Sequence, residues 1–201
     1  MRNYLPIIVF VALCLTLANC GVMSVNPITA PEESSYDSRL DGIWTIKDDK
    51  SQVFLHVGKA NENMTEIVYI EHKNNGSIDR AIFSAYPSKI NNSYYANVQI
   101  LDPKDEINLY FFLKYEFIDS NTLSISFLDG NIIQQLIENG KLKGSKANEE
   151  SAQKLKSSNV VNTKMYIEIT DSSKNIKNII RNMGSDKLFK EAFVVKRLNI
   201  S

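Results

Sequence analysis

Cysteine and histidine are scarce in this chain. Its 201 residues include two cysteines, Cys14 and Cys20, so the sequence after residue 20 offers no disulfide and no thiol nucleophile. The two histidines, His56 and His72, lack the short His and Cys spacings that hold a zinc ion. The sequence therefore predicts no metal site and no bound cofactor.

The motifs of common enzymes and nucleotide-binding proteins are missing as well. No Gly-x-Ser-x-Gly is present, and residues 140–146 lack the Gly-Lys-Ser/Thr ending of a phosphate loop. Basic and acidic side chains balance, 23 against 23, and no basic-aromatic platform indicates a nucleic-acid partner. We therefore expect a protein that is not an enzyme. Catalysis by a carboxylate pair stays open, with candidates at Asp102, Asp105, Glu106 and Glu116.

Long apolar runs are absent beyond the N-terminus. Residues 5–17 are apolar at all but three positions, and they follow a single positive side chain, Arg2. As a helix these 13 residues span about 20 Å, whereas a transmembrane helix needs about 20 residues. This length is typical of the apolar region of a secretory signal peptide, so residues 1–19 are predicted to be one.

Residues 17–20, at the end of the apolar segment, match a known sequence motif in part. Leu17-Ala18-Asn19-Cys20 resembles the lipobox of bacterial lipoproteins, in which a Leu and two small residues precede the acylated Cys; Asn19 departs from the usual Gly, Ala or Ser. The resemblance implies lipidation, such as palmitate, at Cys20 and a membrane as partner through this anchor. It implies a place in the cell envelope and, with Gly21 instead of Asp, the outer membrane facing the periplasm if the cell is Gram-negative. A non-lipidated secretory signal and an uncleaved anchor remain alternatives.

More loosely, the C-terminal half resembles a recurring class of bacterial envelope lipoproteins. The residues that carry this resemblance are Lys114-Tyr115-Glu116, residues 140–144, Thr170-Asp171-Ser172 and Leu188-Phe189. It implies an address and a fold, and no activity.

Domain organisation follows from composition. Residues 20–38 contain Pro27 and Pro31 and show no apolar periodicity, so we expect a lipidated N-terminus and flexible tether there. Residues 39–201 have the length of a single globular domain.

The pattern of that domain predicts strands followed by a mixed region. Strands are expected at residues 42–46, 52–57, 65–73, 80–87, 94–100, 108–118, 122–128, 164–170 and 192–198, and helices at 132–137 and 171–183. Residues 143–158 are polar and are expected to form a loop or a marginal helix. Strands and helices do not alternate, which argues against a parallel α/β fold. We expect a mainly β domain with two short helices, built as an antiparallel lipocalin-like barrel or a strongly curved sheet. The alternative is an α+β open antiparallel sheet.

A second resemblance supports the barrel. Gly42-Ile43-Trp44 at the first strand, together with Arg197 near the end of the last, resembles the lipocalins and their calycin relatives. In that family a Gly-x-Trp on strand one packs its Trp under a cation from the final strand. The resemblance implies that Trp44 closes one end of the barrel and that Arg197 covers the indole face.

Two roles compete for such a barrel. A binding module would hold a small apolar ligand among inward-facing side chains, with candidates Phe111, Leu113, Tyr115, Leu123, Ile125 and Phe127. A structural or protein-interaction component of the envelope would use the same side chains as a filled core and bind a protein partner elsewhere. The sequence slightly favours the second role. An apolar cavity of about 300 Å³ or more would favour the first.

Overall fold

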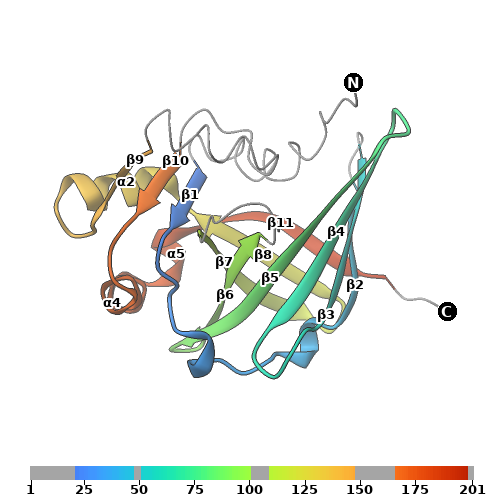
Figure 1. The fold of residues 1–201 in the computed structure, drawn as a ribbon, viewed down its shortest axis with the longest axis horizontal. Helices are drawn as coiled ribbons and strands as arrows, with labels where there is room; N and C mark the ends of the chain where they lie inside the picture. Colours follow the sequence, from blue (N-terminus) through green and yellow to red (C-terminus); the bar gives the residue numbers. More distant parts are fainter. Residues whose placement is uncertain (1–20, 48–50, 101–108, 148–165, 199–201) are drawn as a thin grey trace.

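The computed structural model describes residues 21–47, 51–100, 109–147 and 166–198 (Figure 1). The expected signal peptide at residues 1–19 and the expected lipidation site at Cys20 lie outside these ranges. Within them the chain is mainly β, with eleven strands in one continuous sheet. Among the described residues, no helix is both long enough and apolar enough to cross a lipid bilayer.

Eight of the strands form a closed antiparallel barrel. Seven follow one another along the chain as a meander, and the eighth, β11, lies between β8 and β2. The barrel strands are β2 (Gly42–Lys47), β3 (Ser51–Lys59), β4 (Thr65–Lys73), β5 (Ile78–Ile90), β6 (Ser93–Ile100), β7 (Tyr110–Asp119), β8 (Thr122–Leu128) and β11 (Phe189–Arg197). The pairs Lys196–Thr45 and Arg197–Trp44 close the ring. The expected mainly β barrel is therefore confirmed, and the open-sheet alternative is wrong.

A lobe lies beside the barrel, and all of it except one strand is inserted between the last two barrel strands. We use this name for α2 (Gly130–Glu138), β9 (Gly144–Lys146), β10 (Tyr166–Ile169), α4 (Ser173–Met183) and α5 (Ser185–Leu188), together with the N-terminal β1 (Gly21–Ser24). β1 pairs in parallel with β10 and reaches the barrel through the pair Ser24–Tyr110. Asp129 and Ser172 cap the two longer helices by accepting hydrogen bonds from backbone N–H groups of Asn131 and Asn175. The short β9 lies inside the segment that was expected to be a loop or a marginal helix.

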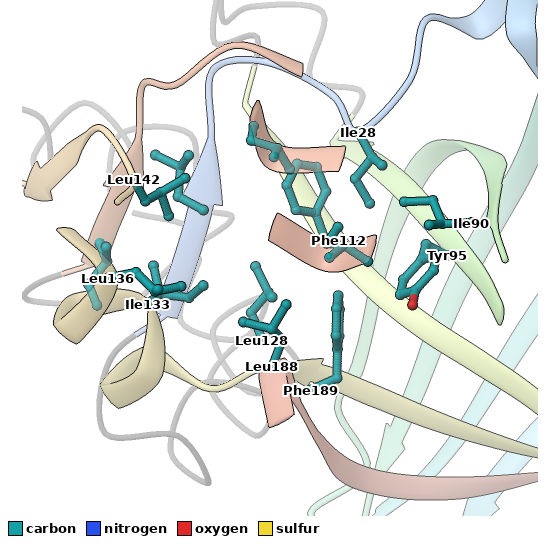
Figure 2. Close-up of a cluster of buried hydrophobic side chains, with 14 residues drawn as sticks. Ile28, Ile90, Tyr95, Phe112, Leu128, Ile133, Leu136, Leu142, Leu188 and Phe189 are labelled. Atoms are coloured by element: carbon teal, nitrogen blue, oxygen red, sulfur yellow. The ribbon is translucent and has the colours of Figure 1, made fainter. Parts of the chain in front are cut away.

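The described residues form two apolar cores that share one barrel wall. Side chains of a strand alternate between its two faces, so neighbouring residues of β7 belong to different cores. Phe111 faces the barrel interior, whereas Phe112 packs into the second core, between the barrel wall and the lobe (Figure 2). This position explains why residues 108–118 are apolar on both faces.

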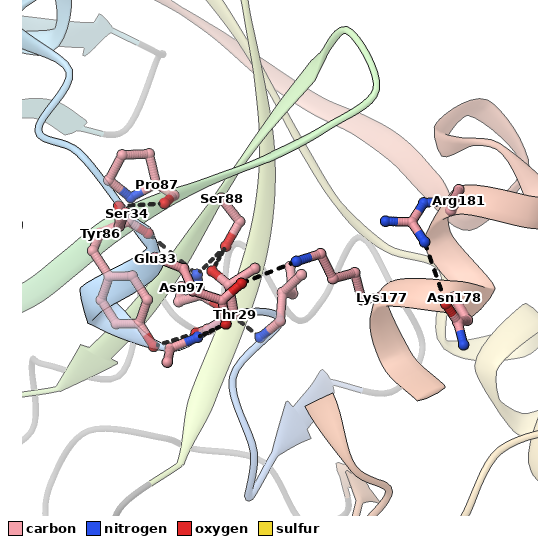
Figure 3. Close-up of polar contacts among 12 residues, drawn as sticks. Thr29, Glu33, Ser34, Tyr86, Pro87, Ser88, Asn97, Lys177, Asn178 and Arg181 are labelled. Carbon is pink, nitrogen blue, oxygen red and sulfur yellow. Dashed lines mark hydrogen bonds and ion pairs between the residues drawn. The ribbon is translucent and has the colours of Figure 1, made fainter. Parts of the chain in front are cut away.

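The segment expected to be a flexible tether is instead part of the fold. Residues 25–37, which we call the strap, run from β1 along the outside of the barrel and include the short 3-10 helix η1 (Pro31–Glu33); η2 (Ser38–Leu40) follows. Ile28 is fully buried, and its backbone N–H donates to Asn97 Oδ1 at 2.7 Å. Figure 3 shows Thr29 beside Ser88, whose hydroxyl oxygens are 2.5 Å apart, and Glu33 bound by Lys177 of α4 at 3.1 Å. The prediction failed because distant side chains satisfy the polar backbone of this proline-containing segment.

Candidate functional site: the barrel interior

Trp44 and Arg197 meet at one end of the barrel. The indole is 1% exposed, and the Arg197 guanidinium carbon lies 4.2 Å from the centre of its ring. Trp44 Nε1 donates to the backbone oxygen of Leu40 at 2.7 Å, which holds η2 against the ring. This is the stacked arrangement that the lipocalin resemblance implied for these two residues.

The same guanidinium ties β11 to two other chain segments at this end, residues 39–41 and the turn between β7 and β8. Its Nη2 donates to the backbone oxygen of Arg39 at 2.6 Å, its Nη1 to that of Asp41, and its Nε to that of Ser120 at 3.3 Å. Gly42 lies against it with a φ of +124°, and a Cβ at this position would be 2.7 Å from Arg197 Nη1. The backbone conformation therefore favours glycine in the Gly-x-Trp triplet, and a larger residue would also force the Arg197 guanidinium to shift.

Polar residues beside η2 complete the closure. Asp37 binds Arg39 at 2.6 Å and accepts a hydrogen bond from the Tyr115 hydroxyl at 3.1 Å. Burial acts to raise the pKa of Asp37, but hydrogen bonds from Arg39 and Tyr115 and the charge of Arg39 outweigh it and leave that pKa lowered. Burial and the Asp37 charge raise the pKa of Tyr115, which stays a neutral donor. The sequence missed Asp37 and Arg39 because both fall at the edge of the presumed tether.

An apolar cavity of about 150 Å³ lies inside the barrel. All six residues expected to face the interior line it, namely Phe111, Leu113, Tyr115, Leu123, Ile125 and Phe127. The other strands contribute lining residues that the sequence did not single out, among them Leu55, Ile67, Phe83, Val98, Phe193 and Val195. Trp44 and Leu40 lie at its wall, as do Gly21 and Val22 of β1. The interior is therefore not completely filled by side chains. Its cavity is nevertheless smaller than the volume of about 300 Å³ that would favour ligand binding over a structural role.

Thr65 is an exception in this apolar wall. It opens β4, lies opposite Ala85 and is 2% exposed. Its hydroxyl oxygen has no hydrogen-bond partner in the described structure. A buried hydroxyl without a partner destabilises a protein, because water satisfies the same group in the unfolded chain.

A buried pair of acids lies elsewhere on the same hairpin. Glu71 and Asp79 occupy directly opposite positions of β4 and β5, and both are at most 3% exposed. Lys73 approaches Asp79 at 2.6 Å, and the Tyr69 hydroxyl donates to Glu71 at 3.0 Å. The lysine forms an ion pair with Asp79, and neither acid lines the cavity.

The acids named from the sequence do not form such a pair in the described structure. Glu116 is exposed on the outer face of β7, 4.0 Å from Lys114, and Asp102, Asp105 and Glu106 lie outside the described residues. In the described ranges, no three side chains of the metal-ligating types gather in one place.

Comparison of the chain with protein-family models, with curated proteins and with solved structures finds no match.

Proposed function

We propose that this protein binds a small apolar molecule inside its barrel. The observation that carries the proposal is the cavity of about 150 Å³, whose wall is almost entirely aliphatic and aromatic. An engineered protein cavity of about this volume stays dry and binds benzene. A ligand with the size of a single ring therefore suits the space, and burial of its apolar surface would drive binding.

The size of the cavity also favours a second candidate function. Pockets for larger ligands measure about 300 to 1,000 Å³, well above the value found here. A structural or protein-interaction role in the envelope needs no ligand, and it remains the competing proposal.

Titration with toluene tests the first proposal. Toluene is expected to bind the wild-type protein and to raise its melting temperature, because a ligand that binds only the folded state stabilises it. Ala96 lines the cavity, so Ala96→Leu places three further carbon atoms in that space. We expect this variant to bind toluene at least about tenfold more weakly.

Ala81→Leu is the matched control. Ala81 packs against the same core but does not line the cavity, so the same change should leave toluene affinity nearly unaltered. Calorimetry or NMR titration measures the dissociation constant of toluene for the wild type and both variants. Absence of toluene binding to the wild type would favour the structural role instead.

We further propose that a lipid on Cys20 anchors the protein in the bacterial cell envelope. Gly21 follows directly and is buried in β1, so such an anchor would hold the barrel against the bilayer without a spacer. Labelling of cells with palmitate tests this proposal. The wild-type chain should incorporate label and Cys20→Ala should not, whereas equal labelling of both would contradict it.

A further inference from the structure

The barrel interior contains one polar feature that an apolar ligand alone leaves unexplained. Thr65 lines the cavity, is 2% exposed, and its hydroxyl has no hydrogen-bond partner in the described structure. Valine has the same shape and would fill this position without an unpaired polar atom. Threonine here therefore costs stability in the empty protein.

The surroundings offer this hydroxyl no simple internal partner. On β5 the opposite residue is Ala85, on β3 it is Lys59, whose side chain is exposed, and the nearest inward-facing residue along β4 is Ile67. Tyr115 also lines the cavity, but its hydroxyl donates to Asp37. A lone water is a poor partner, because buried waters make about three hydrogen bonds and this wall is otherwise apolar.

We propose that the ligand of the cavity carries one hydroxyl or carbonyl group that forms a hydrogen bond with Thr65 Oγ1. This inference rests on the proposed binding function and names the class of ligand, an apolar molecule of single-ring size with one such polar group. The hydroxyl and the methyl group of threonine share one Cβ, so rotation about χ1 brings either of them to the cavity side. The hydroxyl acts as donor to a carbonyl and as donor or acceptor to a hydroxyl.

Two isosteric pairs test the proposal, one of probe molecules and one of side chains. Phenol and toluene differ by a hydroxyl in place of a methyl group, as threonine and valine do. The dissociation constants of both probes are measured for the wild type and for Thr65→Val. We expect the substitution to weaken phenol binding relative to toluene binding by about tenfold, since it removes the hydrogen bond and leaves the apolar contacts.

Thr45→Val is the matched control. The Thr45 hydroxyl also lacks a partner in the described structure, yet Thr45 does not line the cavity. The ratio of the phenol and toluene dissociation constants should therefore stay at its wild-type value in this variant. Thr65→Ser keeps the hydroxyl and should retain the wild-type ratio. Thermal unfolding verifies that each variant folds, and Thr65→Val should be at least as stable as the wild type.

The outcomes separate the two proposals. Toluene binding with the same phenol-to-toluene ratio in wild type and Thr65→Val would overturn the role of Thr65 and leave the binding function standing. An equal weakening of phenol binding relative to toluene binding in Thr65→Ser and in Thr65→Val would also overturn it, because Thr65→Ser keeps the hydroxyl. Absence of binding for both probes would overturn the binding function, and this inference with it.

Discussion

Asp171 is a buried carboxylate that joins two parts of the lobe. Its Oδ2 accepts hydrogen bonds from the backbone N–H of Lys143 at 2.9 Å and from Asn175 Nδ2 at 2.6 Å, and its Oδ1 accepts one from the backbone N–H of Ser172 at 2.8 Å. The first contact reaches the turn before β9, and the others lie at the start of α4. One side chain therefore fixes this helix against the sheet of the lobe.

The charge of Asp171 makes stability depend on pH. Burial acts to raise its pKa, but the hydrogen bonds from Asn175, Lys143 and Ser172 and the charge of Lys143 outweigh it, so the pKa lies below the ordinary value of 3.8. A carboxyl group with a lowered folded-state pKa stabilises the fold above its unfolded-state pKa. That contribution is lost as the pH falls through the folded-state value.

We expect Asp171→Asn to be less stable than the wild type at pH 7 by about 1 kcal/mol, because an amide replaces the charged acceptor. The difference should shrink as the pH falls below about 4, because the unfolded chain then takes up a proton at this carboxylate first, and the folded carboxylate follows only at a lower pH. Urea unfolding at pH 7, 4 and 3 measures it, with Glu66→Gln, a change at an exposed barrel residue, as control. A stability difference that stays constant over this range would contradict the role of the Asp171 charge.

At the scale of the element, local patterns predict strands well when one face of each strand meets a core. In β8, Leu123, Ile125 and Phe127 alternate with polar residues, and all three line the cavity. The Asn75-Gly76 step predicts the β4–β5 turn, where Gly76 has a φ of +82°. The identity of one wall of the site could therefore be read from alternation alone.

The strap shows where such patterns fail. Its order depends on contacts between residues far apart in the chain, such as Tyr86 with Thr29, which are 57 positions apart, and Asn97 with Ile28, which are 69 positions apart. These contacts join a side chain to the backbone, so they leave no periodic trace in the sequence. The three-residue β9 is likewise too short to show a period. Cavity volume depends on how all the side chains of the interior fit together, so the sequence predicted part of the lining and gave no value for the volume.

At the scale of the whole molecule, the barrel and the lobe are parts of one structure. The lobe is inserted between β8 and β11, and its last helix ends where Phe189 pairs with Leu128. The backbone N–H of Asp129, just after β8, donates to the backbone oxygen of Leu188 at 2.8 Å. Because one barrel wall carries side chains of both cores, the lobe cannot separate without exposing that wall. We therefore expect barrel and lobe to unfold together.

Two spectroscopic signals distinguish the parts. Trp44 is the single tryptophan of the chain and reports on the barrel, whereas the α-helices that the structure describes all lie in the lobe and dominate circular dichroism at 222 nm. Leu188 is fully buried in the core beneath the lobe. Leu188→Ala should lower the free energy of unfolding by about 2 to 4 kcal/mol, through lost burial and the cavity it leaves.

The loss should appear in both signals at the same denaturant concentration, as in a two-state transition. Val194→Ala, at a residue 38% exposed on β11, is the control and should shift the midpoint little. A Leu188→Ala protein in which the helical signal is lost first, while Trp44 fluorescence keeps its wild-type midpoint, would show that the barrel folds without the lobe. In that case the lobe would be an independent attachment, and the shared wall would not couple the two cores.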